Sequence, residues 1–299
     1  MRLDAAIAGL GTHGLRRDAE GTATDHAWSA VRAAADDAGL PLGEIDGLIV
    51  CRSGGASEAD LGLELQAELG LEDLKFLEVA LCEGASAILA IQTAALLVTA
   101  GVATCVACVF GDAPMRPGER ASAAFSGVKG PVGLRSLRYS AGLFGAPALY
   151  ALACRCYMAE RGVTPDDLAA VAIAARGWAV HNPSAIFRTP LDRDTYFNAR
   201  WIAEPLRLYD CANPVNGAAA VIVTTGARAA DLRQPAVPIL GMGQAHNRTP
   251  MKSFAVADLM RPAEQAAGRM FASAGMTPAD VDVLQCYDAF SFLTPMCLE

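Results

Sequence analysis

The sequence predicts an α/β protein built from two copies of one strand–turn–helix–strand unit. Residues 6–11 and 238–243 both read as an apolar strand that runs into a Gly-x-Gly turn. Residues 38–40 and 274–276 each close an Ala-rich stretch with a glycine where a helix is expected to end. These matches occur in the same order and at nearly the same offset, which is stronger than any single motif. A length of 299 residues suits one large or two fused α/β units.

The first copy is predicted to continue past its second strand, residues 47–51. The expected elements are a Glu- and Leu-rich helix at 58–69, a strand at 76–81, a helix at 85–100 and a strand at 104–110. Further along the chain, the pattern predicts helices at 148–161 and 169–179 and a buried strand at 217–225. Thr164 and Pro165 precede the later helix as an N-cap with proline at the first helical position.

The second copy is expected to stop early. Residues 281–282 correspond to residues 45–46 and open a second strand at 283–287. By the same offset, the remaining helices and strands of this copy would fall beyond Glu299, so we expect a second half that is truncated at its C-terminal end. The alternative is that strand–helix–strand units resemble one another by their nature, without a duplication.

Composition excludes several classes of protein. A net charge of −8 argues against nucleic acid or an anionic membrane surface as the main partner. The sequence has no apolar run as long as a membrane span and no signal peptide pattern at its start. Nine cysteines, an odd number within mostly apolar stretches, are typical of reduced thiols and favour the cytoplasm. Cys105 and Cys108 have zinc-ligand spacing but lack two further ligands, so no metal is expected.

Three strings resemble the sterol-carrier or lipid-transfer-protein branch of the thiolase superfamily. They are residues 209–220, residues 181–183 together with 200–205, and residues 287–292. The resemblance covers essentially the whole chain and implies a five-layered α-β-α-β-α fold. It implies an N-terminal half at 1–111 and 208–226, a loop and insertion region at 112–207, and an incomplete C-terminal half at 227–299. It also implies a homodimer that pairs through residues 76–81, and a small OB-fold, zinc-ribbon partner that binds acyl-CoA.

The reactive cysteine of thiolases has no counterpart at the expected position. In that superfamily the thiolate lies at the N-terminus of a buried helix, whose dipole stabilises it. Counting back along the predicted helix places Gly84 there, followed by free N–H groups at Ala85, Ser86 and Ala87. Such a helix end can bind a thioester oxygen or an enolate but cannot form an acyl-enzyme. The resemblance is therefore nearest to the steroid side-chain-cleaving acyl-CoA aldolases, which cleave a β-hydroxyacyl-CoA into a ketone and a short acyl-CoA.

Tyr287 is the leading catalytic candidate, because relatives place an oxyanion-binding Asn or His there. A phenol could donate to the developing oxyanion or transfer a proton; the alternative is a packed Tyr that donates to a backbone carbonyl. Cys82 is the alternative nucleophile, for an acetyl-CoA C-acyltransferase, although buried free cysteines are commonly inert. A third hypothesis is a lipid- or acyl-CoA-binding subunit without chemistry of its own.

The remaining candidates rest on weaker patterns. Ser86 could hydrogen-bond a thioester or simply cap its helix. His181 and His246 are expected in loops rather than as bases. The Gly/Pro/Ser-rich segment 112–145 is expected to cover the site. Its basic residues could hold the coenzyme A phosphates or could be solvated: Arg116, Arg120, Lys129, Arg135 and Arg138.

Overall fold

The computed structural model of the chain describes residues 3–18, 20–51, 61–116, 118, 124, 136–246 and 254–299. It divides into two compact units. The first unit comprises Met1–Val128 and Pro214–Met242, and the second comprises Lys129–Asn213 and Gly243–Glu299.

The first unit is built on a six-stranded sheet with the order β3-β2-β4-β7-β1-β8. Strand β2 pairs in parallel with β3 and β4, whereas β7 runs antiparallel to β4 and β1. The carboxyl ends of β1 to β4 therefore share one edge of the sheet. The strands are β1 (Ala6–Arg16), β2 (Gly47–Cys51), β3 (Phe76–Ala80), β4 (Cys105–Asp112), β7 (Asn216–Thr224) and β8 (Val237–Pro238).

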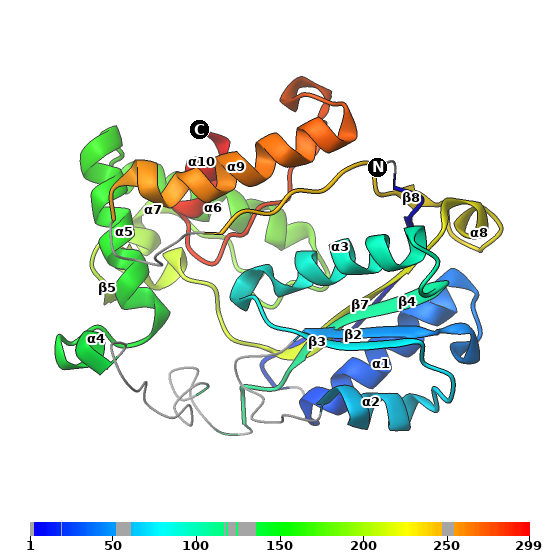
Figure 1. Cartoon of the computed structure of the whole chain (residues 1–299). Coiled ribbons are helices and arrows are strands. Elements are labelled where there is room, and N and C mark those ends of the chain that lie inside the picture. Colours follow the sequence, from blue (N-terminus) through cyan, green and yellow to red (C-terminus); the bar gives the residue numbers. More distant parts are fainter. Residues whose placement is uncertain are drawn as a thin grey trace. The chain divides into compact units, whose positions relative to one another are not determined.

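Helices cover both faces of this sheet. Helices α1 (Ala23–Ala38) and α2 (Leu61–Leu69) pack on one face, and α3 (Ser86–Thr99) packs on the other (Figure 1). Apolar side chains alternate along β2 and β4, so that one set joins the core beneath α1 and α2 and the other joins the core beneath α3. The short helix α8 (Gly226–Ala230) follows β7. All strands and helices predicted for the first copy are confirmed where the structure describes them, with ends shifted by a few residues.

The two glycines near the start of the chain lie inside β1, not in the turn that the sequence predicted. A Cβ on Gly9 would meet the Ala34 carbonyl oxygen at 2.3 Å, and a Cβ on Gly11 would meet the Ala30 carbonyl oxygen at 2.1 Å. The glycines therefore let α1 approach the strand closely. The predicted helix stop is confirmed, because Gly39 ends α1 in the left-handed conformation with φ +74°.

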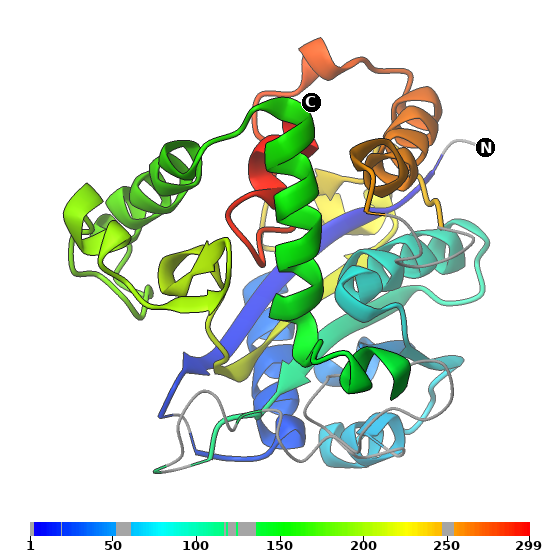
Figure 2. The same cartoon turned by 90° about the vertical axis from the view of Figure 1, so that its left-hand side faces the viewer.

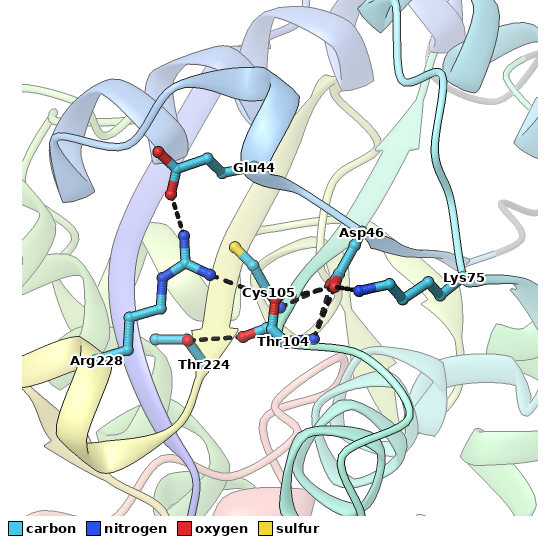
Figure 3. A network of polar contacts seen from close by, with 7 residues as sticks. All are labelled: Glu44, Asp46, Lys75, Thr104, Cys105, Thr224 and Arg228. Carbon is cyan, nitrogen blue, oxygen red and sulfur yellow. Dashed lines mark hydrogen bonds and ion pairs between the residues drawn. The ribbon is translucent and has the colours of Figure 1, made fainter.

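A polar network ties together the amino ends of the parallel strands (Figure 3). The carboxylate of Asp46 accepts hydrogen bonds from Lys75 Nζ at 3.0 Å, from Cys105 N at 2.8 Å, and from the N–H and hydroxyl of Thr104. Burial by itself raises the pKa of Asp46, but the hydrogen bonds from Cys105, Lys75 and Thr104 outweigh it and lower that pKa below its ordinary value. Nearby, Arg228 pairs with Glu44.

The second unit is mainly helical. Helices α5 (Gly145–Arg161) and α9 (Val256–Ala274) contact each other, and the segment that leads into α10 (Leu293–Leu298) runs along α5 (Figure 2). Helix α6 (Pro165–His181) begins at the predicted N-cap Thr164, which forms a capping box with Asp167. The other elements are α4 (Ser136–Ser140), α7 (Arg193–Phe197), and the two-stranded pair β5 (Trp201–Ala203) and β6 (Leu206–Arg207).

Of the two strands predicted for the second copy, the first forms only in part and the second does not form among the described residues. The first is reduced to Val237–Pro238, and residues 283–287 have neither strand nor helix backbone. A strand exists only beside a neighbour that accepts its hydrogen bonds, and the described part of the chain places none next to residues 283–287. The predicted stop of the preceding helix is confirmed at Gly275, with φ +68°. Within the described ranges, no helix has the length and apolarity needed to cross a membrane.

Candidate active site

The turn between β3 and α3 carries four of the residues predicted for the site, Cys82, Gly84, Ala85 and Ser86. It contains a short 3-10 helix, Glu83–Ala85, in front of the first residue of α3, Ser86. The Ser86 hydroxyl is buried, accepts a hydrogen bond from Cys82 N at 2.8 Å and donates one to the Glu83 carbonyl oxygen at 2.8 Å. Ser86 therefore closes the turn that joins the strand to the helix.

Backbone strain marks the same turn. Glu83 adopts φ +48°, in the left-handed region that residues other than glycine seldom occupy. The turn contacts α3. The Ser86 hydroxyl holds it by binding the Cys82 N–H, before Glu83, and the Glu83 carbonyl oxygen, after it. Strained backbone of this kind persists only where surrounding contacts enforce it, and it is common at functional sites.

Two of the three amides predicted to be free are used within the turn. The N–H of Ala85 donates to the Cys82 carbonyl oxygen at 3.0 Å, and the N–H of Ser86 donates to the Glu83 carbonyl oxygen. The prediction was wrong for these two amides because the α-helix does not start directly after the strand. The intervening 3-10 helix satisfies them locally. The N–H of Gly84 takes part in neither bond.

No sulfur lies at the start of α3. Gly84 stands in the middle of the 3-10 helix, and Cys82 lies before it, four positions ahead of Ser86. Cys82 is the N-cap residue of that 3-10 helix, and its side chain makes no capping hydrogen bond. Burial raises the pKa of two other thiols of the first unit, to about 11 for Cys51 and about 12 for Cys105. Both side chains are buried in the core of the sheet.

A small apolar cavity of about 120 Å³ lies beside the first turns of α3 in the first unit. Ala87 and Ile91 of α3 line one side, and strand residues line the other. The cavity offers almost no polar surface. It can take an apolar group but cannot bind a charged one. The strand residues are Cys51, Cys108, Val109, Phe110, Ala219, Ala220 and Val221.

Tyr287 belongs to the second unit, and its side chain is 55% exposed. This exposure does not favour the alternative of a packed Tyr that donates to a backbone carbonyl. The residues just after it are fixed: Ala289 accepts a hydrogen bond from Ala212 N at 2.9 Å, and Phe290 stacks on Tyr150 at 4.5 Å between ring centroids. Tyr287 is thus a solvent-accessible phenol next to an anchored segment.

The weaker candidates are placed only in part. Arg116 is exposed after β4, and Arg138 lies in α4, although its side chain is outside the described residues. Arg120, Lys129 and Arg135 also lie outside them. His181 ends α6 and is exposed, as is His246. Among the described residues, no cluster of His, Cys, Asp or Glu could hold a metal ion.

A histidine pair in the first unit has no signal in the sequence. His13 Nδ1 of β1 and His26 Nδ1 of α1 lie 3.1 Å apart, so one ring must donate and the other accept. His26 is fully buried, and burial, followed by the charge of His13, lowers its pKa. Residues 13 positions apart on a strand and a helix follow no sequence period that would bring them together.

Comparison with known proteins identifies the class. Residues 243–299 match the thiolase C-terminal domain-like family. The chain is 34% identical to a 17-hydroxy-3-oxo-4-pregnene-20-carboxyl-CoA lyase of Mycobacterium tuberculosis, over 99% of this chain and 78% of the relative. It is 32% identical to a steroid side-chain-cleaving aldolase of Thermomonospora curvata, over 98% of this chain and 75% of the relative. The solved Ltp2-ChsH2(DUF35) aldolase superposes with a TM-score of 0.81 at 28% identity, over 99% of this chain and 75% of that one.

The α/β fold, the helix start without a thiol and these relatives define an enzyme of the thiolase superfamily. The chain belongs to this superfamily, on the sterol-carrier-type branch that includes the side-chain-cleaving aldolases. The predicted family, the fold class and the class of enzyme, an acyl-CoA carbon–carbon lyase, are confirmed.

Proposed function

We propose that this chain catalyses the retro-aldol cleavage of a β-hydroxyacyl-CoA with a steroid-like acyl part, releasing a ketone and a short acyl-CoA. The observation that carries the proposal is Gly84, in the 3-10 helix directly before α3, at the position where the family resemblance places the thiol of an acyl-transferring thiolase. The names of two relatives, a steroid carboxyl-CoA lyase and a steroid side-chain-cleaving aldolase, support the substrate class.

The reaction needs a base and an oxyanion site but no covalent intermediate. A base takes the proton of the β-hydroxyl, the bond between the α and β carbons breaks, and the β carbon becomes a ketone. The electron pair moves into the thioester as an enolate, which then takes a proton at the α carbon. We assign donation to the enolate oxygen, or proton transfer, to Tyr287. We also assign thioester contacts to the turn formed by Gly84, Ala85 and Ser86; the N–H groups of Ala85 and Ser86 are engaged within the turn, so we assign the donor role there to the Gly84 N–H.

The assembly we propose is a homodimer that binds a small acyl-CoA-binding partner. The solved aldolase is named for two components, Ltp2 and ChsH2(DUF35), which supports a second protein as partner; we propose that this partner has the OB-fold and zinc ribbon that the family resemblance implies. The basic residues Arg116, Arg120, Lys129, Arg135 and Arg138 are candidates for coenzyme A phosphate contacts. All nine cysteines are free thiols, which supports a cytoplasmic location.

Cys82 provides the sharpest test of the proposal. Retro-aldol cleavage of a β-hydroxyacyl-CoA should proceed in Cys82→Ala and after iodoacetamide treatment, because no step uses a thiol. Thiolytic cleavage of a β-ketoacyl-CoA should not be detected with the untreated wild-type protein, whereas the acyltransferase hypothesis expects it there and expects its loss in Cys82→Ala. Loss of cleavage activity in Cys82→Ala, with retained folding, would reject the aldolase proposal in favour of chemistry that uses Cys82.

The non-catalytic alternative is distinguished by reconstitution. If the chain only binds acyl-CoA, it gives no ketone product either alone or with the OB-fold partner, while still binding the thioester. The aldolase proposal expects ketone release from the chain in at least the reconstituted assembly, measured by chromatography of the products.

A further inference from the structure

Asp210 is a buried carboxylate with an unusually full set of donors in the second unit. Its side chain accepts hydrogen bonds from Tyr196 Oη at 2.8 and 2.9 Å, from Ser291 Oγ at 2.6 Å and from Arg207 N at 2.7 Å. The residue is 2% exposed. A buried charge with this many donors around it has a single well-defined geometry. Asp210 therefore fixes the groups that donate to it.

One of these donors belongs to the segment that carries Tyr287. Ser291 lies four residues after Tyr287, and its backbone N–H donates to the Asp210 carbonyl oxygen at 2.9 Å. Its hydroxyl and its amide thus both bind the same residue. An isolated β-bridge joins Cys211 to Phe290 beside them. Together these contacts attach the segment to residues 210–212.

On the other side of Tyr287 the chain has little to hold it. Residues 281–285 are exposed and form no strand or helix. The nearest regular structure upstream is the 3-10 helix Pro278–Asp280. On this side, Cys286 interacts with the side chain of Cys297 in α10. Among the described residues, the backbone hydrogen bonds at 289–291 are the main-chain contacts that hold the Tyr287 segment.

We propose that Asp210 is a positioning residue for Tyr287, acting through its double attachment to Ser291. This inference rests on the proposed function, in which Tyr287 contacts the reacting thioester. Asp210 itself touches no substrate; it holds the backbone from which the phenol projects. A displacement of about 1 Å at such a group can lower turnover by about a hundredfold.

The donors to Asp210 provide a matched pair of variants. Ser291→Ala removes the hydroxyl on the Tyr287 segment that donates to Asp210. Tyr196→Phe removes a hydroxyl on α7 that donates to the same carboxylate, and it leaves the Tyr287 segment attached. Hydrogen exchange of the full-length chain reads the Ser291 and Ala212 amides directly. Exchange should accelerate in Ser291→Ala and remain at the wild-type rate in Tyr196→Phe. Equal exchange of these amides in both variants would overturn the positioning role, whatever the chain catalyses.

Turnover of a β-hydroxyacyl-CoA provides the second readout. Ser291→Ala should lower kcat by at least about tenfold with KM unchanged, Tyr196→Phe should keep kcat, and Ser291→Thr, which restores a hydroxyl, should recover most of it. Faster exchange without a fall in kcat would contradict the inference. A wild-type chain without cleavage activity would refute the proposed function, while the exchange data would still decide whether Asp210 holds the segment.

Discussion

The phenol of Tyr287 carries the chemical assignment at the scale of single residues. Its motif was visible in the sequence, because residues 287–292 match a string of the branch, and the structure adds that the side chain is exposed. The backbone conformation and hydrogen bonding of Gly84, Ala85 and Ser86 could not be predicted from the sequence, because a 3-10 helix and a left-handed Glu83 have no periodic sequence pattern. Likewise, the bond between Asp210 and Ser291 joins residues 81 positions apart.

Tyr287→Phe should lower kcat/KM for β-hydroxyacyl-CoA cleavage by about 10²–10³, the usual effect of removing one oxyanion donor. The phenyl ring keeps the shape of the side chain, so the melting temperature should not change. Tyr139→Phe is a matched control, since Tyr139 is an exposed phenol on α4 of the same unit. Steady-state kinetics of both variants provide the measurement, and an unaltered Tyr287→Phe enzyme would remove Tyr287 from the mechanism.

At the scale of elements, the first copy was predictable because its signals are local. Apolar strands and the stop at Gly39 act within a few residues, and both occur as expected in β1 and α1. The second-copy strands could not be predicted from local pattern alone. An apolar run becomes a strand only when a neighbour accepts its hydrogen bonds, and residues 283–287 have no such neighbour in the described chain.

The close contact between β1 and α1 predicts that any side chain at Gly9 or Gly11 destabilises the first unit. Gly11→Ala places a Cβ 2.1 Å from the Ala30 carbonyl oxygen, so the helix must move, and we expect a loss of about 1–3 kcal/mol in the free energy of unfolding. Gly43→Ala is the control, because a Cβ there meets nothing within 4 Å. Urea denaturation of both variants measures the difference. Equal stabilities would show that α1 does not lie this close to the strand.

The Asp46 network predicts acid sensitivity of the first unit. Asp46→Ala leaves the buried Cys105 N–H without its acceptor and should cost about 1–3 kcal/mol. Lys75→Met, which removes only a half-exposed partner, should cost less than Asp46→Ala, because water screens an exposed ion pair.

The pH dependence follows from the sign of the shift. The folded pKa of Asp46 lies below its ordinary value of 3.8, so its contribution is complete above that value and is lost as the pH falls through the folded pKa. Urea midpoints measured from neutral pH down to about pH 3 should therefore fall less steeply in Asp46→Ala than in the wild type. Parallel curves would contradict the assignment.

At the scale of the whole molecule, the edge strand β3 is the feature that an assembly would use. Its outer edge has no neighbour among the described strands of the first unit, and Val79 and the following Leu81 are 41% and 60% exposed. The division into halves at 1–111 with 208–226, 112–207 and 227–299 stays a prediction.

A β3-paired homodimer predicts that Leu81→Lys shifts the chain to a monomer, because the new charge would be desolvated in the interface. Val102→Lys, an exposed apolar position beyond α3, should leave the dimer intact. Light scattering coupled to size exclusion measures both. A wild-type monomer, or a dimer that resists Leu81→Lys, would rule out pairing through β3.

The central claim is that carbon–carbon cleavage here proceeds without a covalent acyl-enzyme. Intact-protein mass spectrometry during turnover of a β-hydroxyacyl-CoA, with chromatography of the products, tests it most directly. We predict equal amounts of ketone and shortened acyl-CoA, with the protein mass unchanged at every time point. An acyl adduct on Cys82 or any other thiol that forms and decays at the rate of turnover would contradict the account.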